Sequence, residues 1–140
     1  MNWRLILQLS LLALGMGVAS VFLIPPTIEP LFWLVIFAFC AYVLARNTTR
    51  PFLHGLFLGL ANCVWIIAAH VIFFDRYVAG HPAEAGMLKS MPAPDWPRLM
   101  MVLFGIPFGI VSGCVIGLFA WIASKFVKPN PTIAGDPIRH

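Results

Sequence analysis

The chain has 140 residues, of which 61% are apolar and only 10% are charged. Soluble domains carry about 25% charged residues, so this charge is too sparse to cover a soluble surface, and the apolar excess must face lipid. The composition excludes a disordered chain, a collagen-like chain and a soluble enzyme domain. The net charge is +4, but the nine basic residues are dispersed singly, so we expect no nucleic-acid binding.

Four stretches without Asp, Glu, Lys or Arg predict membrane-spanning helices. They are 20, 15, 23 and 26 residues long and cover residues 5–24, 31–45, 52–74 and 99–124. At 1.5 Å per residue, three of them can cross a hydrocarbon core of ~30 Å. The short second stretch reaches this length as a helix over 28–48, with Thr27 as the expected N-cap, Glu29 at the positive end of the dipole and Pro30 in the first turn.

The first stretch also has features of a signal peptide. Arg4 precedes it, and Gly-Val-Ala at residues 17–19 resembles a cleavage site. Its apolar run is longer than the usual region of about 7–15 residues, so we favour a retained helix. The sequence therefore predicts an all-α, single-domain, four-helix transmembrane bundle over residues 1–128, followed by a short flexible cytoplasmic tail over 129–140.

The distribution of basic residues predicts the orientation. One side of the four spans holds six Lys and Arg residues, and the other side holds three. By the positive-inside rule, both termini are expected to be cytoplasmic, in a bacterial inner membrane. Residues 75–98 then form a long periplasmic loop with four prolines, in which residues 82–89 can form a short helix that begins at Pro82. The loop is either a plain connection, which we favour, or a functional lid.

Glycines at a spacing of four mark the last span as a packing surface. Between helices in lipid, small residues permit close backbone contact, which is a main source of association. The third span has a comparable face. The partner of the last span is either a helix of the same chain or a second subunit. The predicted packing residues are Gly105, Gly109, Gly113 and Gly117 on the last span, with Gly55 and Gly59 on the third.

A few polar side chains lie within the spans. Polar residues are costly against lipid, so we expect them to face the interior of the bundle. They form either interhelical hydrogen bonds, which we favour, or a hydrated or ligand-binding interior. The candidates are Gln8, Asn62, His70 and Ser112.

Titratable residues are densest where the third span meets the long loop. His70, Asp75 and His81 are weak candidates for a divalent metal site or a pH-sensitive site, with Arg76 and Tyr77 between them. An ordinary polar cap at the membrane interface is the favoured interpretation. No Cys-x-x-Cys and no His-x-x-x-His motif is present, so we expect no cofactor.

The sequence contains no enzyme motif among those we searched, including a Gly-rich phosphate loop and Gly-x-Ser-x-Gly. We therefore expect a non-enzymatic structural or assembly protein of the lipid bilayer, either a homo-oligomer or a subunit of a larger membrane complex. The alternative is a channel or transporter for a small solute or ion, with a polar pathway lined by the first, third and last spans.

Overall fold

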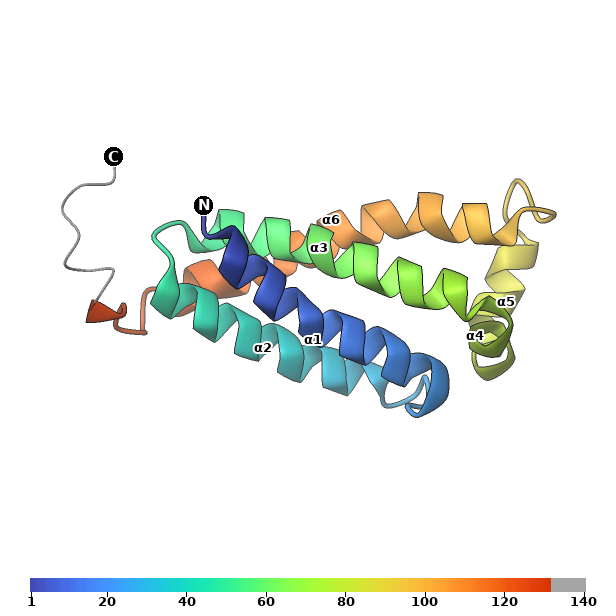
Figure 1. Cartoon of the computed structure of the whole chain (residues 1–140), viewed down its shortest axis with the longest axis horizontal. Coiled ribbons are helices and arrows are strands. Elements are labelled where there is room, and N and C mark those ends of the chain that lie inside the picture. Colours follow the sequence, from blue (N-terminus) through green and yellow to red (C-terminus); the bar gives the residue numbers. More distant parts are fainter. Residues whose placement is uncertain (132–140) are drawn as a thin grey trace.

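The computed structural model describes residues 1–131, and this part of the chain contains only helices and their connections (Figure 1). The helices are α1 (Trp3–Phe22), α2 (Glu29–Asn47), α3 (Pro51–Ile72), α4 (Phe74–Gly80), α5 (Pro82–Lys89) and α6 (Pro97–Ala123). Four of them, α1, α2, α3 and α6, are long and apolar enough to cross a membrane. They confirm the predicted spans to within two residues at each end. Most of the predicted tail, residues 132–140, lies outside the described part.

Prolines start several of these helices. A proline lies in the first two positions of α2, α3, α5 and α6, where its missing N–H costs little. Helix α5 has the bounds predicted for the short helix. The expected N-cap of α2 is wrong, because the cap position is Ile28 and no side chain caps the helix. The carboxylate of Glu29 is therefore free to bind elsewhere.

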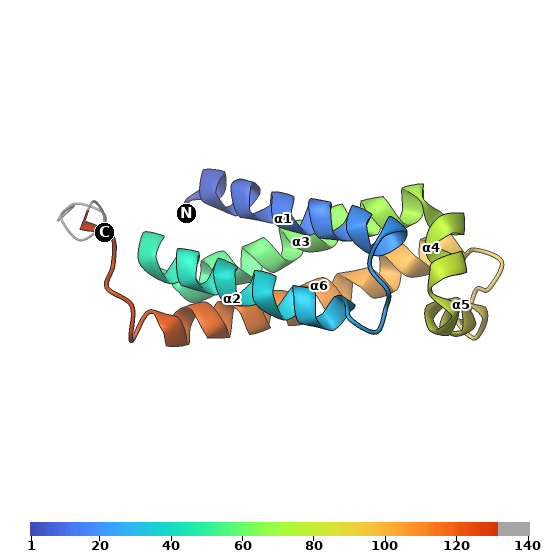
Figure 2. The ribbon, with the colours of Figure 1, turned by 90° about the horizontal axis from the view of Figure 1, so that it is seen from below.

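The four long helices form an elongated bundle with two different ends. Helices α4 and α5 lie across one end, which we call the capped end (Figures 1 and 2). The start of α1, the connection between α2 and α3, and the end of α6 lie at the other end, which we call the terminal end. The most extensive contact in the bundle is between α3 and α6, followed by that between α1 and α3.

Glycine brings α3 and α6 together at the terminal end. A Cβ added to Gly55 would overlap the backbone of Gly117, and a Cβ added to Gly59 would overlap the backbone of Gly113. Further along, Gly109 lies against Cys63, whose Sγ donates to the carbonyl of Gly105 at 3.2 Å. All four glycines of α6 thus face α3 of the same chain. Beside this contact lies the buried apolar core: Ile6, Leu9, Cys40, Ala41, Leu44, Leu58, Ile116 and Ala120.

The face of helix α1 that is buried does not include Gln8. Its buried polar residues are Ser10 and Ser20, whereas Gln8 and Gly15 are exposed. The hydroxyls of the two serines donate to carbonyls of their own helix, Ser10 to Leu7 at 2.8 Å and Ser20 to Gly17 at 3.0 Å. A serine that bonds its own backbone can be buried at little cost. The prediction of an interior position for Gln8 is wrong.

Candidate functional site

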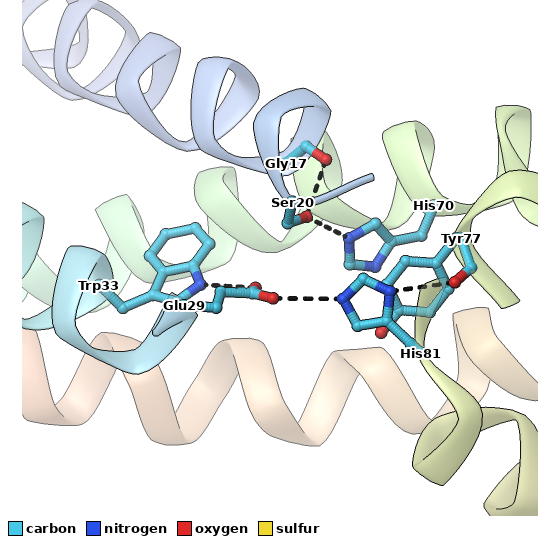
Figure 3. A network of polar contacts seen from close by, with 7 residues as sticks. All are labelled: Gly17, Ser20, Glu29, Trp33, His70, Tyr77 and His81. Atoms are coloured by element: carbon cyan, nitrogen blue, oxygen red, sulfur yellow. Dashed lines mark hydrogen bonds and ion pairs between the residues drawn. The ribbon is translucent and has the colours of Figure 1, made fainter. Parts of the chain in front are cut away.

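The most extensive set of polar side-chain contacts lies at the capped end (Figure 3). Four elements contribute to it: α1, α2, α3 and α4, together with the residue that joins α4 to α5. We call this set the polar cluster, and its members are Ser20, Glu29, Trp33, His70, Tyr77 and His81.

The centre of the polar cluster is a stack of three rings. The imidazole of His70 lies 4.0 Å from the ring centroid of Tyr77 at an interplanar angle of 20°, and that of His81 lies 4.3 Å from it at 21°. The break at Phe73, between α3 and α4, allows Tyr77 to stack on His70. His81 follows Tyr77 by four residues, the spacing at which side chains of one helix meet. The stack therefore fixes α4 against the end of α3.

His81 joins this stack to α2 through Glu29. His81 is 2% exposed, and its Nε2 lies 3.4 Å from Glu29 Oε2, while its Nδ1 lies 3.0 Å from the carbonyl oxygen of Tyr77. A carbonyl only accepts, so Nδ1 carries a proton. The opposite nitrogen of the same ring, Nε2, makes the contact with Glu29 and so joins α4 to α2.

Glu29 and Ser20 each connect the cluster to a further group. The other carboxylate oxygen of Glu29 accepts a hydrogen bond from Trp33 Nε1 at 3.0 Å. Ser20 Oγ lies 3.2 Å from His70 Nε2 and donates its own proton to the Gly17 carbonyl, so the His70 ring is the donor to Ser20. The polar cluster thus ties α1, α2, α3 and α4 together.

Asp75 does not belong to the polar cluster. Its side chain is 93% exposed and pairs with Arg98 at 3.7 Å on the surface. In the described part of the chain, no group of three His, Cys, Asp or Glu residues could hold a metal ion. The prediction that placed Asp75 beside His70 and His81 is wrong, because Asp75 and Tyr77 lie on different faces of α4. Glu29, 52 residues away in sequence from His81, takes the place predicted for Asp75.

A cavity of about 470 Å³ extends from the polar cluster into the bundle. It lies between α2, α3 and α6, and residues of α4 and α5 line its outer part. Its polar lining is formed by Glu29, Asn62, His70, Tyr77, Glu84 and Ser112. Its apolar lining includes Trp33, Phe37, Phe104, Phe108, Met87, Met91 and Met101. The cavity is thus amphipathic, with titratable groups gathered at the capped end.

Two acceptors at this cavity have no hydrogen-bond partner. Both Asn62 Oδ1 and Glu84 Oε2 are buried atoms without one. Asn62 is only 4% exposed and lies in the middle of α3, whereas Glu84 is in the first turn of α5. Buried polar groups are nearly always hydrogen-bonded, so within residues 1–131 these two acceptors leave the residues that line the cavity short of hydrogen-bond donors.

The pKa of Tyr77 depends on the carboxylates at the capped end. Burial of the phenol raises the pKa of Tyr77 well above its ordinary value, and the nearby carboxylates of Glu84 and Glu29 raise it further. Tyr77 is 9% exposed and lines the cavity. The tyrosine is therefore a neutral phenol at physiological pH.

A second cavity, of about 370 Å³, lies on the other side of the polar cluster. It is lined by the connection between α1 and α2 and by parts of α1 and α4, including Arg76. Ser20 and His81 border this second cavity, while their partners His70 and Glu29 border the first. The polar cluster therefore contributes to the walls of both cavities.

The sequence pointed to part of this site. Asn62, His70 and Ser112 line the large cavity, whereas Gln8 is exposed on α1. Ser20, Glu29, Trp33 and Glu84 were missed as site residues. The sequence predicted Glu29 only as a residue at the positive end of a helix dipole. The available signal was that Glu29, Glu84, His70 and His81 all belong to the same predicted side of the membrane.

The chain matches no protein-family model, and neither a curated protein nor a solved structure is detectably similar to it.

Proposed function

We propose that this chain is a non-enzymatic membrane protein that binds an amphipathic small molecule in the cavity at its capped end. The observation that carries the proposal is the cavity of about 470 Å³ with two buried, unpartnered acceptors, Asn62 Oδ1 and Glu84 Oε2. Small-molecule sites are typically cavities of about 300–1,000 Å³ with an apolar lining and a few polar groups that fix orientation. This cavity has such a size, and its lining is mostly apolar with a few polar groups.

The lining suits an elongated ligand with one polar end. Along α3 it extends from Gly59 to His70, which is about 16 Å at 1.5 Å per residue. Met87, Met91 and Met101 line it, and methionine adapts readily to different apolar shapes. A polar head would lie at the capped end, and an apolar body would extend toward Asn62.

Access from the bilayer is available along α6. Phe108 is 68% exposed and Phe104 is 44% exposed, yet both border the cavity. Met87, on α5, is also both exposed and part of the lining. A hydrophobic ligand could therefore enter between α5 and α6 without passing through water, and α5 would serve as a lid.

A continuous pathway across the membrane has less support than a closed binding site. Where the cavity ends, on its side toward the terminal end, Gly55 and Gly59 on α3 meet Gly117 and Gly113 on α6 with no room for side chains. The apolar core fills the space beside them, with Ile6, Leu44, Leu58 and Ile116 at 1% exposure or less. A channel or transporter would have to open the tightest packing in the bundle.

The glycine stripe of α6, which favoured an assembly function, does not support that function in the folded chain. The glycine stripe of α6 was a candidate surface for a second subunit, but in this chain it is covered by α3. Most of the exposed side chains of α6, such as Val111 and Leu118, are large and apolar, as lipid contact requires. In our proposal, the glycine stripe of α6 therefore stabilises the fold of the monomer by packing against α3.

We further propose that the chain lies in a bacterial inner membrane with both termini in the cytoplasm, because six of the nine basic residues lie on that side. The capped end would then face the periplasm, and the long connection of residues 75–98 would be periplasmic. Fusions of alkaline phosphatase and green fluorescent protein within residues 80–94 and at the C-terminus test this orientation. A periplasmic C-terminus would contradict it.

The binding proposal is tested with three amphiphiles of equal chain length: decylamine, 1-decanol and decanoate. Titration calorimetry at pH 7 would compare the full chain in lipid nanodiscs with empty nanodiscs. The key variant is Ser112→Phe, which fills the cavity from α6. Its matched control is Val111→Phe, because Val111 is 61% exposed and is not part of the lining.

We expect at least one amphiphile to bind saturably to the wild type and to Val111→Phe, and none to bind saturably to Ser112→Phe. Thermal unfolding would show that both variants are folded. If no amphiphile binds beyond the empty nanodisc, or if Ser112→Phe binds as the wild type does, the proposed function is wrong.

A further inference from the structure

We propose that the ligand of this cavity is an amphipathic organic cation, whose ammonium group pairs with Glu84 and whose apolar body extends along α3 toward Asn62. This inference rests on the proposed function and specifies its ligand class. It is carried by the carboxylate of Glu84, by the unpartnered amide oxygen of Asn62, and by the absence of Lys and Arg from the lining.

Glu84 is the carboxylate of the lining that has no side-chain partner. Its Oε2 is buried without a hydrogen-bond partner, and it makes no ion pair within residues 1–131. An ionised carboxylate accepts hydrogen bonds and cannot donate them. A cationic donor that reaches the carboxylate from the cavity would form the strongest such bond.

Glu29 does not compete for the same cation. Its two oxygens already have partners, because one accepts a hydrogen bond from Trp33 and the other contacts His81. Of the two carboxyl groups in the lining, Glu84 is therefore the one without a side-chain partner. A single cation would neutralise it.

The remaining lining favours an organic cation over a metal ion. Ca²⁺ takes about six to eight oxygen ligands, whereas the cavity offers few oxygens and a largely apolar wall. Aromatic rings stabilise organic cations through their negative faces. Trp33, Phe37, Phe104 and Phe108 supply such rings.

Asn62 supplies a second, independent indication. It is 4% exposed, its Oδ1 has no partner, and it lies on the cavity wall eight residues before His70. Eight residues correspond to about 12 Å along α3. The deep end of the cavity thus also has a hydrogen-bond acceptor, so the apolar body of the ligand should end in a second donor group beside Asn62, which the decyl probes lack.

The three decyl amphiphiles test the inference because they share a chain and differ in head-group charge. At pH 7 decylamine is a cation, since primary amines titrate near 10.4. In wild-type nanodiscs we expect decylamine to bind at least tenfold more tightly than 1-decanol and decanoate. Glu84→Gln preserves the shape of the side chain and should weaken decylamine binding by about tenfold or more, while changing 1-decanol binding less than threefold.

Asp95→Asn is the matched control for charge. Asp95 is an exposed acidic residue near the same end of the bundle and is not part of the lining, so its neutralisation should leave decylamine binding within a factor of two.

Equal binding of 1-decanol and decylamine to the wild type would overturn the inference that the ligand is a cation, while the proposed function would stand. An equal loss in Asp95→Asn and Glu84→Gln would also overturn it, because the effect would then be general surface charge. Failure of every amphiphile to bind would instead contradict the proposed function.

Discussion

The two ends of the bundle handle buried polarity in opposite ways. At the terminal end, His54 is 5% exposed and fully satisfied: its Nδ1 lies 2.8 Å from the carbonyl of Arg50 and its Nε2 accepts from the backbone N–H of Asn2 at 3.0 Å. Both contacts suit a neutral imidazole. At the capped end, His81 contacts a carboxylate, and Glu84 and Asn62 keep unpartnered acceptors.

The packing differs in the same way. At the terminal end, glycines of α3 and α6 meet backbone to backbone and leave no room for a side chain. Toward the capped end the same two helices border a cavity of about 470 Å³. Under the proposed function, the closely packed half of the bundle stabilises the fold and the half with the cavity binds the ligand.

The largest effect is expected from breaking the tight half. In Gly55→Ala, the new Cβ would overlap the backbone of Gly117 and of Ile116, neither of which can move as a side-chain tip can. We expect a loss of unfolding free energy of about 1–3 kcal/mol, as for overpacked cores. Gly15→Ala is the matched control, because nothing lies within 4 Å of a Cβ at Gly15. Denaturation in mild detergent measures both; equal stability of the two variants would show that α3 and α6 do not meet through these glycines.

An effect of similar size is expected from disconnecting the capped end. Glu29→Ala leaves Trp33 Nε1 and His81 without their partner, which should cost about 1–3 kcal/mol and speed hydrogen exchange in α4 and α5. Glu29→Gln should restore most of the loss, since its amide can accept from Trp33 and donate to a neutral His81.

Asp75→Ala provides the comparison within the same end. The Asp75–Arg98 pair is solvent-exposed, so its removal should leave stability and exchange unchanged. If Asp75→Ala loosened α4 and α5 as much as Glu29→Ala does, the polar cluster would not be what holds the cap.

Much of the fold could be predicted from the sequence, because the spans are long, apolar and bounded by charges. The short helix after Pro82 was predicted from the same kind of local signal. The break at Phe73 was not predicted, since the third apolar stretch continues to Phe74 without proline or glycine. Tertiary contact decides this break, because Tyr77 stacks on His70 across it.

The site was harder to predict than the fold. Asn62, His70 and Ser112 are recognisable as costly polar residues in apolar spans. Glu29 lies 52 residues from His81, and nothing local in either sequence segment indicates that they meet. Asp75 was preferred for its proximity in sequence, but its position on α4 points it to the surface. Spacing within one helix identifies a face, whereas pairing between helices depends on how the bundle packs.

The electrostatics of the capped end can be sharpened through Tyr77. Its pKa is raised by burial and by the carboxylates of Glu84 and Glu29. The unfolded chain loses this proton near pH 10, whereas the folded chain retains it, so the folded state loses stability as pH rises above about 10. Tyr77→Phe should reduce this alkaline loss. Tyrosinate absorbance, taken as wild type minus Tyr77→Phe, gives the pKa, and Glu84→Gln should lower it toward the ordinary value. An unchanged pKa in Glu84→Gln would mean that Glu84 does not face Tyr77.

The smallest effect compares two serines of α1. Ser10 accepts from Trp65 Nε1 at 3.0 Å, and Ser20 contacts His70 Nε2 at 3.2 Å. Hydrogen bonds between helices in membranes contribute about 0.6 kcal/mol on average, so each Ser→Ala change should cost about that much. Ser10→Ala should lose more unfolding free energy than Ser20→Ala. The indole N–H of Trp65 can only donate, and Trp65 does not line the large cavity, so it finds no new acceptor there. His70 borders the cavity, where water or ligand can replace Ser20 as its hydrogen-bond partner. Unfolding free energies in mild detergent measure the two losses; a larger loss in Ser20→Ala would mean that the cavity offers His70 no substitute partner, and the contrast between a closed half and an open half would not extend to α1.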